Sequence, residues 1–419
     1  MFQICLYSHW RSIVEQPKFW KWAILKIDKE NIEEVLSSRR LRIVTGATLE
    51  CSGDVSSSCL DSFLKVYIHI SSMLRTDAIK FQLKTLNISA NLEEEKTRES
   101  LTELICNVEE VNLSESDMKS SKLFEKIASC EDLRLKHLIV NNIDISSFPK
   151  DLVSKTLRKI EDVNISQSSM RYTQLNQLFE DLLTAEDSQL KRLDLSQNNL
   201  SYFLQYAGLC LLEEVRLCQV FITTNTLTNI LSSIAKSTNL KLRHLDLSDN
   251  NLSKLSPAAL AEAATKLEKL SVSRTKLNPE QITGIFSRLR KQPDSKLKSL
   301  NISNNRLSAP PPGFRNNSLS VSALPARMLT RGLCNLEEAN LANTRLNTQQ
   351  VTAIFNDLLN IVPLQLKSFN LSNNNLSSVS LPALQNAVTR LEQINLVSCR
   401  LNLHHVLSLN LKDFAQKYI

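Results

Sequence analysis

Apolar residues recur at fixed positions through most of the chain, in the pattern L-x-x-L-x-L-x-x-N/C/T-x-L. The four best copies begin at Leu190, Leu242, Leu297 and Leu366. Eight weaker copies complete a set of twelve and begin at Leu83, Val108, Leu135, Ile160, Leu212, Leu267, Leu336 and Leu391. Because apolar and polar residues alternate in the middle of each copy, each one predicts a short strand with its leucines on one face.

The segments between the longer-spaced copies predict helices. Residues 282–289 carry apolar side chains at i, i+3, i+4 and i+7, which is the spacing of one helix face. Asn278 and Pro279 stand just before them, as a helix N-cap and first helical residue. The same arrangement recurs in residues 175–183, 227–234 and 351–359. Strands that alternate with helices at this period predict a curved α/β solenoid, with a parallel sheet on the concave face and helices on the convex face.

The residue at the turn of each copy also follows a rule. It is Asn at positions 198, 250, 305 and 374, and Thr or Cys at positions 275, 344 and 399. An Asn can donate hydrogen bonds to the carbonyls of neighbouring loops and form a ladder, which Thr and Cys do weakly and Val220 cannot do. Long repeats with alternating Asn and Thr/Cys turns resemble the ribonuclease-inhibitor type of leucine-rich repeat. The resemblance covers residues 80–419.

One repeat is longer than its counterparts by a proline-rich insertion at residues 308–321. Three successive prolines cannot join a helix, so the insertion should bulge from the solenoid, as a ligand flap or as a tolerated surface loop. Before residue 83 the pattern is weaker. Strands are predicted at 23–27 and in 41–50, and helices at 31–37 and 63–74. We therefore divide the chain into a helical N-terminal segment (1–27), degenerate early repeats (28–82) and the solenoid (83–419).

The N-terminal segment contains all three tryptophans of the chain. Trp10 is followed by Pro17, Phe19 and Trp20, a spacing that resembles the C-terminal half of an F-box, with Tyr7 where that family usually has Cys. The resemblance implies that these four residues contact a Skp-type adaptor, and that the chain is a substrate receptor of an SCF-type ubiquitin ligase. The chain begins inside the third helix of that module, so we expect either a fragment or a protein that has lost adaptor binding. The alternative is an aromatic cap over the first repeat.

Composition excludes several classes of function. Six glycines form neither GxGxxG nor GxxxxGK[ST], which excludes the usual nucleotide cradles, so no cofactor is expected. The net charge of +7 is spread among acids without a basic stripe, which argues against nucleic acid. Nine scattered cysteines indicate a reducing compartment, and neither a signal peptide nor an 18-residue apolar run is visible. We expect a cytoplasmic or nuclear protein that does not bind membranes.

The sequence offers no catalytic constellation. HExxH, CxxC and GxSxG are absent, and the nearest approach to a metal cluster is Cys399 with His404 and His405. Since Cys399 stands at the turn position, the repeat itself explains it. We expect neither an enzyme nor a metal site.

Recognition of a protein by the concave face is better supported. Charged residues flank the inward leucines in the middle of the solenoid, at Asp162, Arg192, Asp194, Glu214, Arg216, His244, Asp246 and Lys269. They could form a partner-binding surface anchored by the long side chains, or they could pair with one another across adjacent strands. Asp, Asn and Ser at the middle positions are also common repeat filler. A general interaction or inhibitor scaffold with no ubiquitin role is the alternative function. A GTPase-activating solenoid is disfavoured because the C-terminal tail is not acidic.

Overall fold

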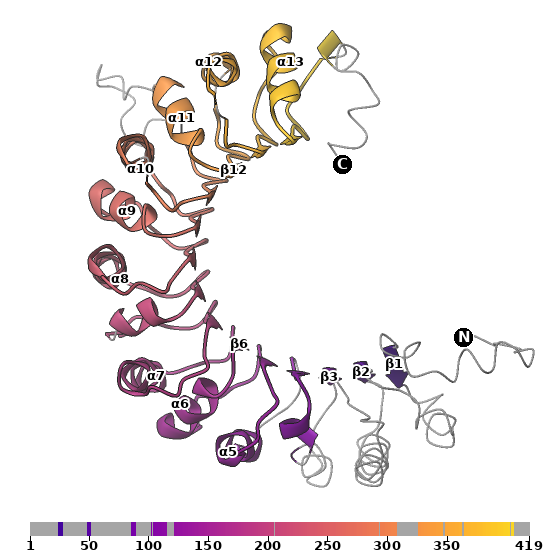
Figure 1. The fold of residues 1–419 in the computed structure, drawn as a ribbon, viewed down its shortest axis with the longest axis vertical. Helices are drawn as coiled ribbons and strands as arrows, with labels where there is room; N and C mark the ends of the chain where they lie inside the picture. The colour runs from indigo at the N-terminus through magenta and orange to yellow at the C-terminus, as the bar shows by residue number, and fades with distance from the viewer. Residues whose placement is uncertain are drawn as a thin grey trace, which may run out of the picture. The chain divides into compact units, whose positions relative to one another are not determined.

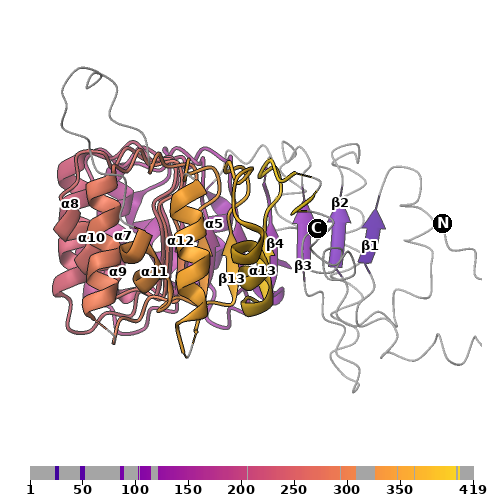
Figure 2. The same ribbon diagram turned by 90° about the horizontal axis from the view of Figure 1, so that it is seen from above.

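The computed structural model describes residues 24–27, 48–51, 85–88, 102, 104–114, 121–204, 206–292, 294–307, 326–346, 348–362, 364–402 and 404–405. The chain forms two compact units, Met1–Asn199 and Leu200–Ile419. Each unit is an α/β stack in which the described strands alternate with helical segments (Figures 1 and 2).

The first unit contains a parallel sheet whose strands follow one another in chain order. Its described strands are β1 (Ile24–Ile27), β2 (Thr48–Cys51), β3 (Thr85–Ile88), β4 (Glu110–Asn112), β5 (His137–Ile139), β6 (Asp162–Asn164) and β7 (Arg192–Asp194). The helical segments between them are the 3-10 turn η4 (Ile105–Asn107), α5 (Lys122–Ser129), α6 (Lys150–Arg158) and α7 (Tyr172–Thr184).

The second unit repeats this arrangement, again with parallel strands in chain order. Its described strands are β8 (Glu214–Arg216), β9 (His244–Asp246), β10 (Lys269–Ser271), β11 (Ser299–Asn301), β12 (Glu338–Asn340), β13 (Ser368–Asn370) and β14 (Gln393–Asn395). Its helical segments are η5 (Tyr206–Leu211), α8 (Thr224–Lys236), α9 (Pro257–Ala264), α10 (Pro279–Lys291), α11 (Ala326–Leu333), α12 (Thr348–Leu359) and α13 (Leu381–Arg390).

The predicted repeat is confirmed, because the twelve copies of the sequence pattern supply strands β3 to β14. The strand expected at 23–27 is β1, and the strand expected within 41–50 is represented by β2. Both pair in parallel with the sheet that β3 continues. The helices expected at 31–37 and 63–74, and the insertion at 308–321, lie outside the described residues.

The core of each unit lies between its sheet and its helices. The middle residue of each strand from β4 to β14 and the buried apolar residues of the described helices lie in this layer, as Leu270, Ile282 and Phe286 do with exposed fractions of 2% or less. The face predicted for residues 282–289 is therefore confirmed, and α10 begins at Pro279 with Asn278 as its N-cap. Burial of such apolar surface, at about 25 cal/mol per Å², is the main source of stability between repeats.

The turn residues form the predicted ladder. The side-chain amide of Asn305 donates to the carbonyl of Val272 in the preceding repeat at 2.8 Å and to Ile302 in its own repeat at 2.9 Å. Its oxygen accepts from the backbone N–H groups of Thr275 and Leu277. Asn198, Asn250 and Asn374 also donate to carbonyls of the preceding repeat. Thr275 instead donates to Val272, inside its own repeat, at 2.6 Å.

A buried glutamine at the start of α10 ties the helix to the preceding repeat. Gln281 accepts from the backbone N–H of Asn278 and donates to the carbonyls of Leu252 and Leu255. Gln174 makes the equivalent bonds at the start of α7, to Ile145 and Phe148. These amides satisfy carbonyls that would otherwise be buried without a partner.

Candidate functional site

Each unit presents one face of its sheet away from the helices, and we call this the open face (Figure 1). Along β6 and β9 the middle residue is buried while the first and third residues are partly exposed. The strand alternation predicted for the charged residues is thus confirmed: Asp162, Arg192, Glu214, His244 and Lys269 are first residues of their strands. The third residues of their strands are Asp194, Arg216 and Asp246.

Most third residues carry out a structural task. Asp194 and Asp246 each accept a hydrogen bond, at 2.9 Å, from the backbone N–H two residues further on. The same bond is made by Asn112, Asn164, Asn301, Asn340, Asn370 and Asn395. A short acceptor at this position therefore closes the turn after the strand, and Asp194 and Asp246 fit the interpretation as repeat filler.

In the first unit, a single carboxylate contacts an arginine and a histidine on the open face. Asp162 Oδ2 lies 2.8 Å from Arg192 Nε and 3.5 Å from His137 Nδ1, each on an adjacent strand. Both partners keep part of their surface in solvent, with 36% of the Arg192 side chain and 41% of His137 exposed. The cross-strand pairing considered as an alternative is present, and it fixes the Arg192 guanidinium without burying it.

In the second unit, Glu214 has the corresponding role. Its Oε1 lies 2.8 Å from Arg216 Nη2 on the same strand, and its Oε2 lies 3.4 Å from His244 Nδ1 on β9. Arg216 is 56% exposed, whereas Glu214 is only 22% exposed. The exposed Lys269 stands beside His244 in the strand register, one strand further along. The structure therefore brings together Glu214, Arg216 and His244, with Lys269 next to them.

Other predicted site residues are not described. Trp10, Pro17, Phe19 and Trp20, the positions expected to contact an adaptor, lie outside the residues whose structure is known here. The residue division at 1–27, 28–82 and 83–419 likewise remains a sequence prediction.

The buried thiols are unsuited to chemistry. Burial raises the pKa of Cys334 to about 12, and burial together with the neighbouring Cys130 raises the pKa of Cys106 to about 12. A thiol with so high a pKa carries almost no thiolate at neutral pH, and the thiolate is the nucleophile and the metal ligand. Among the described residues, no group of three or more His, Cys, Asp or Glu side chains could hold a metal ion. The described helices also include none that is long and apolar enough to cross a membrane.

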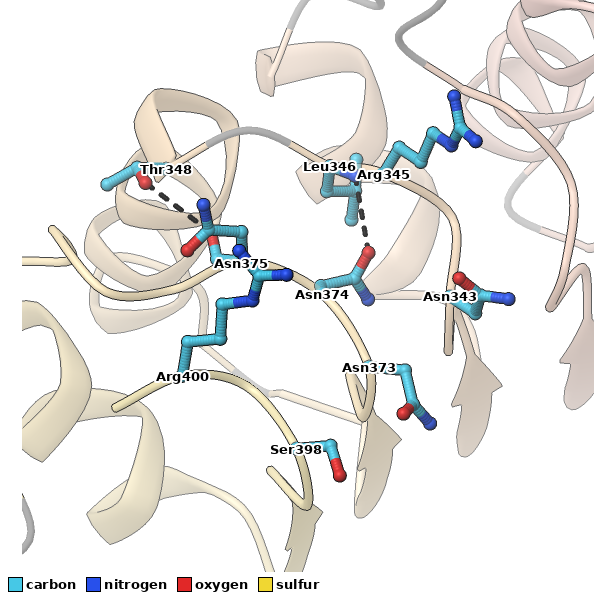
Figure 3. A pocket seen from close by; sticks show the side chains of 9 residues that line it. All are labelled: Asn343, Arg345, Leu346, Thr348, Asn373, Asn374, Asn375, Ser398 and Arg400. Carbon is cyan, nitrogen blue, oxygen red and sulfur yellow. Dashed lines mark hydrogen bonds between the residues drawn. The ribbon is translucent and has the colours of Figure 1, made fainter. Parts of the chain in front are cut away.

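The second unit also contains an open groove that the concave-face hypothesis did not include. It has a volume of about 880 Å³ and lies beside the turns that follow β12, β13 and β14. Figure 3 shows Arg345 and Arg400 on opposite sides of Asn374, with Arg400 extending beside Asn375. The groove is lined by Asn343, Arg345, Leu346, Thr348, Asn373, Asn374, Asn375, Ser398 and Arg400. Comparing the residue after the turn in successive copies would have revealed its two arginines.

The family comparison identifies the same repeat. A family model described as Leucine Rich Repeat matches residues 241–262, 296–317 and 365–387. The chain is a leucine-rich-repeat protein with an α/β solenoid fold. A solved internalin from Listeria monocytogenes is similar at 16% identity and a TM-score of 0.45, over 91% of this chain and 92% of that one. No curated protein matches the sequence.

Proposed function

We propose that this chain is a non-enzymatic protein-binding scaffold, and that the open faces of its sheets hold a segment of a partner protein. The observation that carries the proposal is that Arg192 and Arg216 are each paired with a carboxylate and still exposed to solvent. Each guanidinium has a carboxylate oxygen at 2.8 Å, yet each side chain remains at least one third exposed. An arginine that is already oriented loses less side-chain entropy when it binds, and its planar fork pairs with carboxylates in two places.

Truncation of these anchors tests the proposal. We expect Arg192→Ala and Arg216→Ala each to weaken partner capture by ~1–3 kcal/mol, the cost of losing a charge-assisted hydrogen bond. Thermal stability should change little, because an exposed ion pair contributes only ~0–1 kcal/mol. Arg290→Ala, which removes a charge from the exposed end of α10, is the matched control.

The readout is quantitative mass spectrometry of cross-linked partners. Proteins captured by the wild type and by Arg290→Ala should be depleted with the Arg192→Ala/Arg216→Ala double variant. If the double variant retains every partner, the binding surface lies elsewhere.

We further propose that the scaffold is the substrate-recognition subunit of an SCF-type ubiquitin ligase, with ubiquitin transfer carried out by other subunits. Support comes from the spacing of Trp10, Pro17, Phe19 and Trp20, which resembles half of an F-box. The residues matched by the family model all lie beyond residue 240, so the proposal depends on these four positions alone.

An adaptor-binding measurement separates this role from a plain scaffold. Because the four residues cover only the second half of an F-box contact, we expect the 419-residue chain to bind a Skp-type adaptor more weakly than micromolar. A version extended upstream by a Leu-Pro-containing helix pair should bind tightly, and Trp20→Ala in it should abolish binding while Trp22→Ala does not. Micromolar binding that is indifferent to Trp20→Ala would contradict the F-box assignment. If Trp20→Ala lowers stability but does not change adaptor binding, the result would favour an aromatic cap on a scaffold with no ubiquitin role.

A further inference from the structure

A row of cationic side chains follows the sheet of the second unit at the edge where its strands end. The residue directly after the turn residue is Lys276 in the β10 repeat, Arg306 in β11, Arg345 in β12 and Arg400 in β14. All four are exposed, and only the β13 repeat has a neutral residue there, Asn375. Among the described residues, Lys276, Arg306 and Arg400 form no ion pair.

Among the described turn positions of this edge, none is acidic. The residues directly before and after the turn residue are the two exposed turn positions of each repeat. In the β10 to β14 repeats these positions contain no Asp or Glu. Apart from the four cations named above, they are Arg274, Asn304, Asn343, Asn373, Asn375 and Ser398. Arg274 is the exception among the cations, because Asp249 in the β9 repeat binds its guanidinium at 2.5 and 2.7 Å. Earlier repeats lack the row, with Phe221 and Asn251 at the corresponding positions. The positive edge is therefore confined to the last five repeats and is not a general property of the repeat.

The backbone does not explain these cations. Lys276, Arg345 and Arg400 have φ angles of 59°, 58° and 57°, in the left-handed region. Asn enters this region more readily than Lys or Arg, and Asn343 and Asn373 adopt it one residue before the turn residue of their repeats. A long cationic side chain at three such positions is thus placed against the local backbone preference.

The groove beside β12–β14 supplies the rest of a binding surface. Its lining includes the amides of Asn343 and Asn373 as well as the two arginines, and an amide can both donate to and accept from a peptide backbone. The amide nitrogen of Asn343 also donates to Asn304 Oδ1 at 2.8 Å. Neighbouring strands of a sheet lie ~4.8 Å apart, and residues i and i+2 of an extended chain lie about 6.6 Å apart. Because these spacings are similar, cations one or two strands apart can contact side chains that project from the same side of one extended peptide.

We propose that this edge of the second unit, from Lys276 to Arg400, binds an extended peptide segment rich in Asp and Glu. The arginines pair with its carboxylates, and the groove amides bind its backbone. A protein ligand is favoured over single-stranded nucleic acid because none of the two exposed turn positions of β10–β14 carries an aromatic side chain on which bases could stack. The site is separate from the open-face anchors and does not depend on them.

Asparagine variants provide the test, because Asn is suited to the left-handed backbone and should preserve the fold. We would measure fluorescence anisotropy of a labelled peptide of alternating Glu and Ser, with the Gln–Ser peptide, a phosphoserine–Ser peptide and a single-stranded oligonucleotide of similar length as comparisons. The test variant is the full chain with Arg345→Asn and Arg400→Asn. The matched control is the full chain with Arg290→Gln and Lys291→Gln, which removes two charges at the C-terminal end of α10.

The expected result is binding of the Glu–Ser peptide at least tenfold tighter than the Gln–Ser peptide, weakened at least tenfold by the Asn variant and unchanged by the control. Binding should also weaken as salt rises, because the contacts are exposed. Equal binding of the Gln–Ser peptide, or equal losses in variant and control, would overturn the proposal. So would tighter binding of the phosphoserine peptide or of the oligonucleotide than of the Glu–Ser peptide at the same salt, since the edge would then be a phosphate or nucleic-acid site. Arg192→Ala should leave this binding unchanged, which separates the outcome from that of the proposed scaffold function.

Discussion

Replacing Asn305 should show how much of the stability of the stack depends on one side-chain amide. Asn305 is 1% exposed and makes hydrogen bonds both to the preceding repeat and within its own repeat. Its nitrogen donates to Val272 and Ile302, and its oxygen accepts from the N–H groups of Thr275 and Leu277 at 3.2 and 2.9 Å. In Asn305→Ala, two buried N–H groups lose their acceptor, and each costs about 1–3 kcal/mol. Together with the hydrogen bonds that the Asn305 nitrogen no longer donates, the free energy of unfolding should fall by roughly 3–5 kcal/mol.

Thr275→Ala is the matched comparison at the adjacent turn. Thr275 is fully buried, and its hydroxyl donates to the Val272 carbonyl at 2.6 Å. That carbonyl keeps the bond from Asn305 when the hydroxyl is removed, so no carbonyl is left without a donor. We therefore expect a loss of only about 1 kcal/mol, the net value of an ordinary hydrogen bond.

Two measurements check the pair. Urea unfolding followed by circular dichroism gives the order of the two losses, and hydrogen exchange with mass spectrometry over residues 270–280 gives their location. Exchange at the Leu277 amide should accelerate in Asn305→Ala and stay slow in Thr275→Ala. If Thr275→Ala costs as much as Asn305→Ala, or if exchange accelerates equally, the assignment of the inter-repeat bonds to Asn305 is wrong.

Three further results are expected. Gly332→Ala should destabilise the chain by ~1–2 kcal/mol despite the better helix propensity of Ala, because the new Cβ would lie 2.5 Å from Phe286 Cδ1; thermal unfolding checks this. Cys334, whose pKa burial raises to about 12, should resist iodoacetamide at pH 8 in the native state and react in urea, as site-resolved mass spectrometry would show. Arg274 lowers the pKa of Asp249, so this pair stabilises the fold above the unfolded pKa of ~3.9 and ceases to do so as the pH falls through the folded pKa. Asp249→Asn should therefore cost up to ~1 kcal/mol at pH 7, a difference that disappears in acid unfolding curves.

The fold could be predicted closely because each repeat must satisfy the same local conditions. A leucine that leaves its register would move from the core to the open face, so the pattern fixes the strands β3 to β14 residue by residue. The Asn turns were equally predictable, since one amide can donate to two loops and accept from one of them at the same time, which Thr and Cys do weakly. The buried glutamines Gln174 and Gln281 were not anticipated, because a polar residue in a helix gives no sign in the sequence that it points inward.

The candidate site could be predicted only in outline. Alternation placed Arg192 and Arg216 on the exposed side of their strands, but their carboxylate partners depend on side-chain conformations that no periodicity encodes. Asp194 and Asp246 looked like their charged neighbours in the sequence and prove to be turn acceptors. Arg345 and Arg400 could not be predicted from strand alternation, because the groove that they line lies beside the turns.

The direction of the turn bonds has a consequence for how such a chain can grow. Asn250 reaches back to Leu217, Asn305 to Val272 and Asn374 to Leu341, so each Asn turn secures the Val, Thr or Thr turn before it. The smallest self-consistent piece is thus two repeats, such as the 55 residues from Leu212 to Lys266, which contain the Val220 turn and the Asn250 that secures it. Duplication or excision of a whole pair leaves every buried carbonyl with its donor. Removal of a single repeat would bring two weak turns or two Asn turns together, so lineage changes and engineered shortening of this protein should proceed in steps of two.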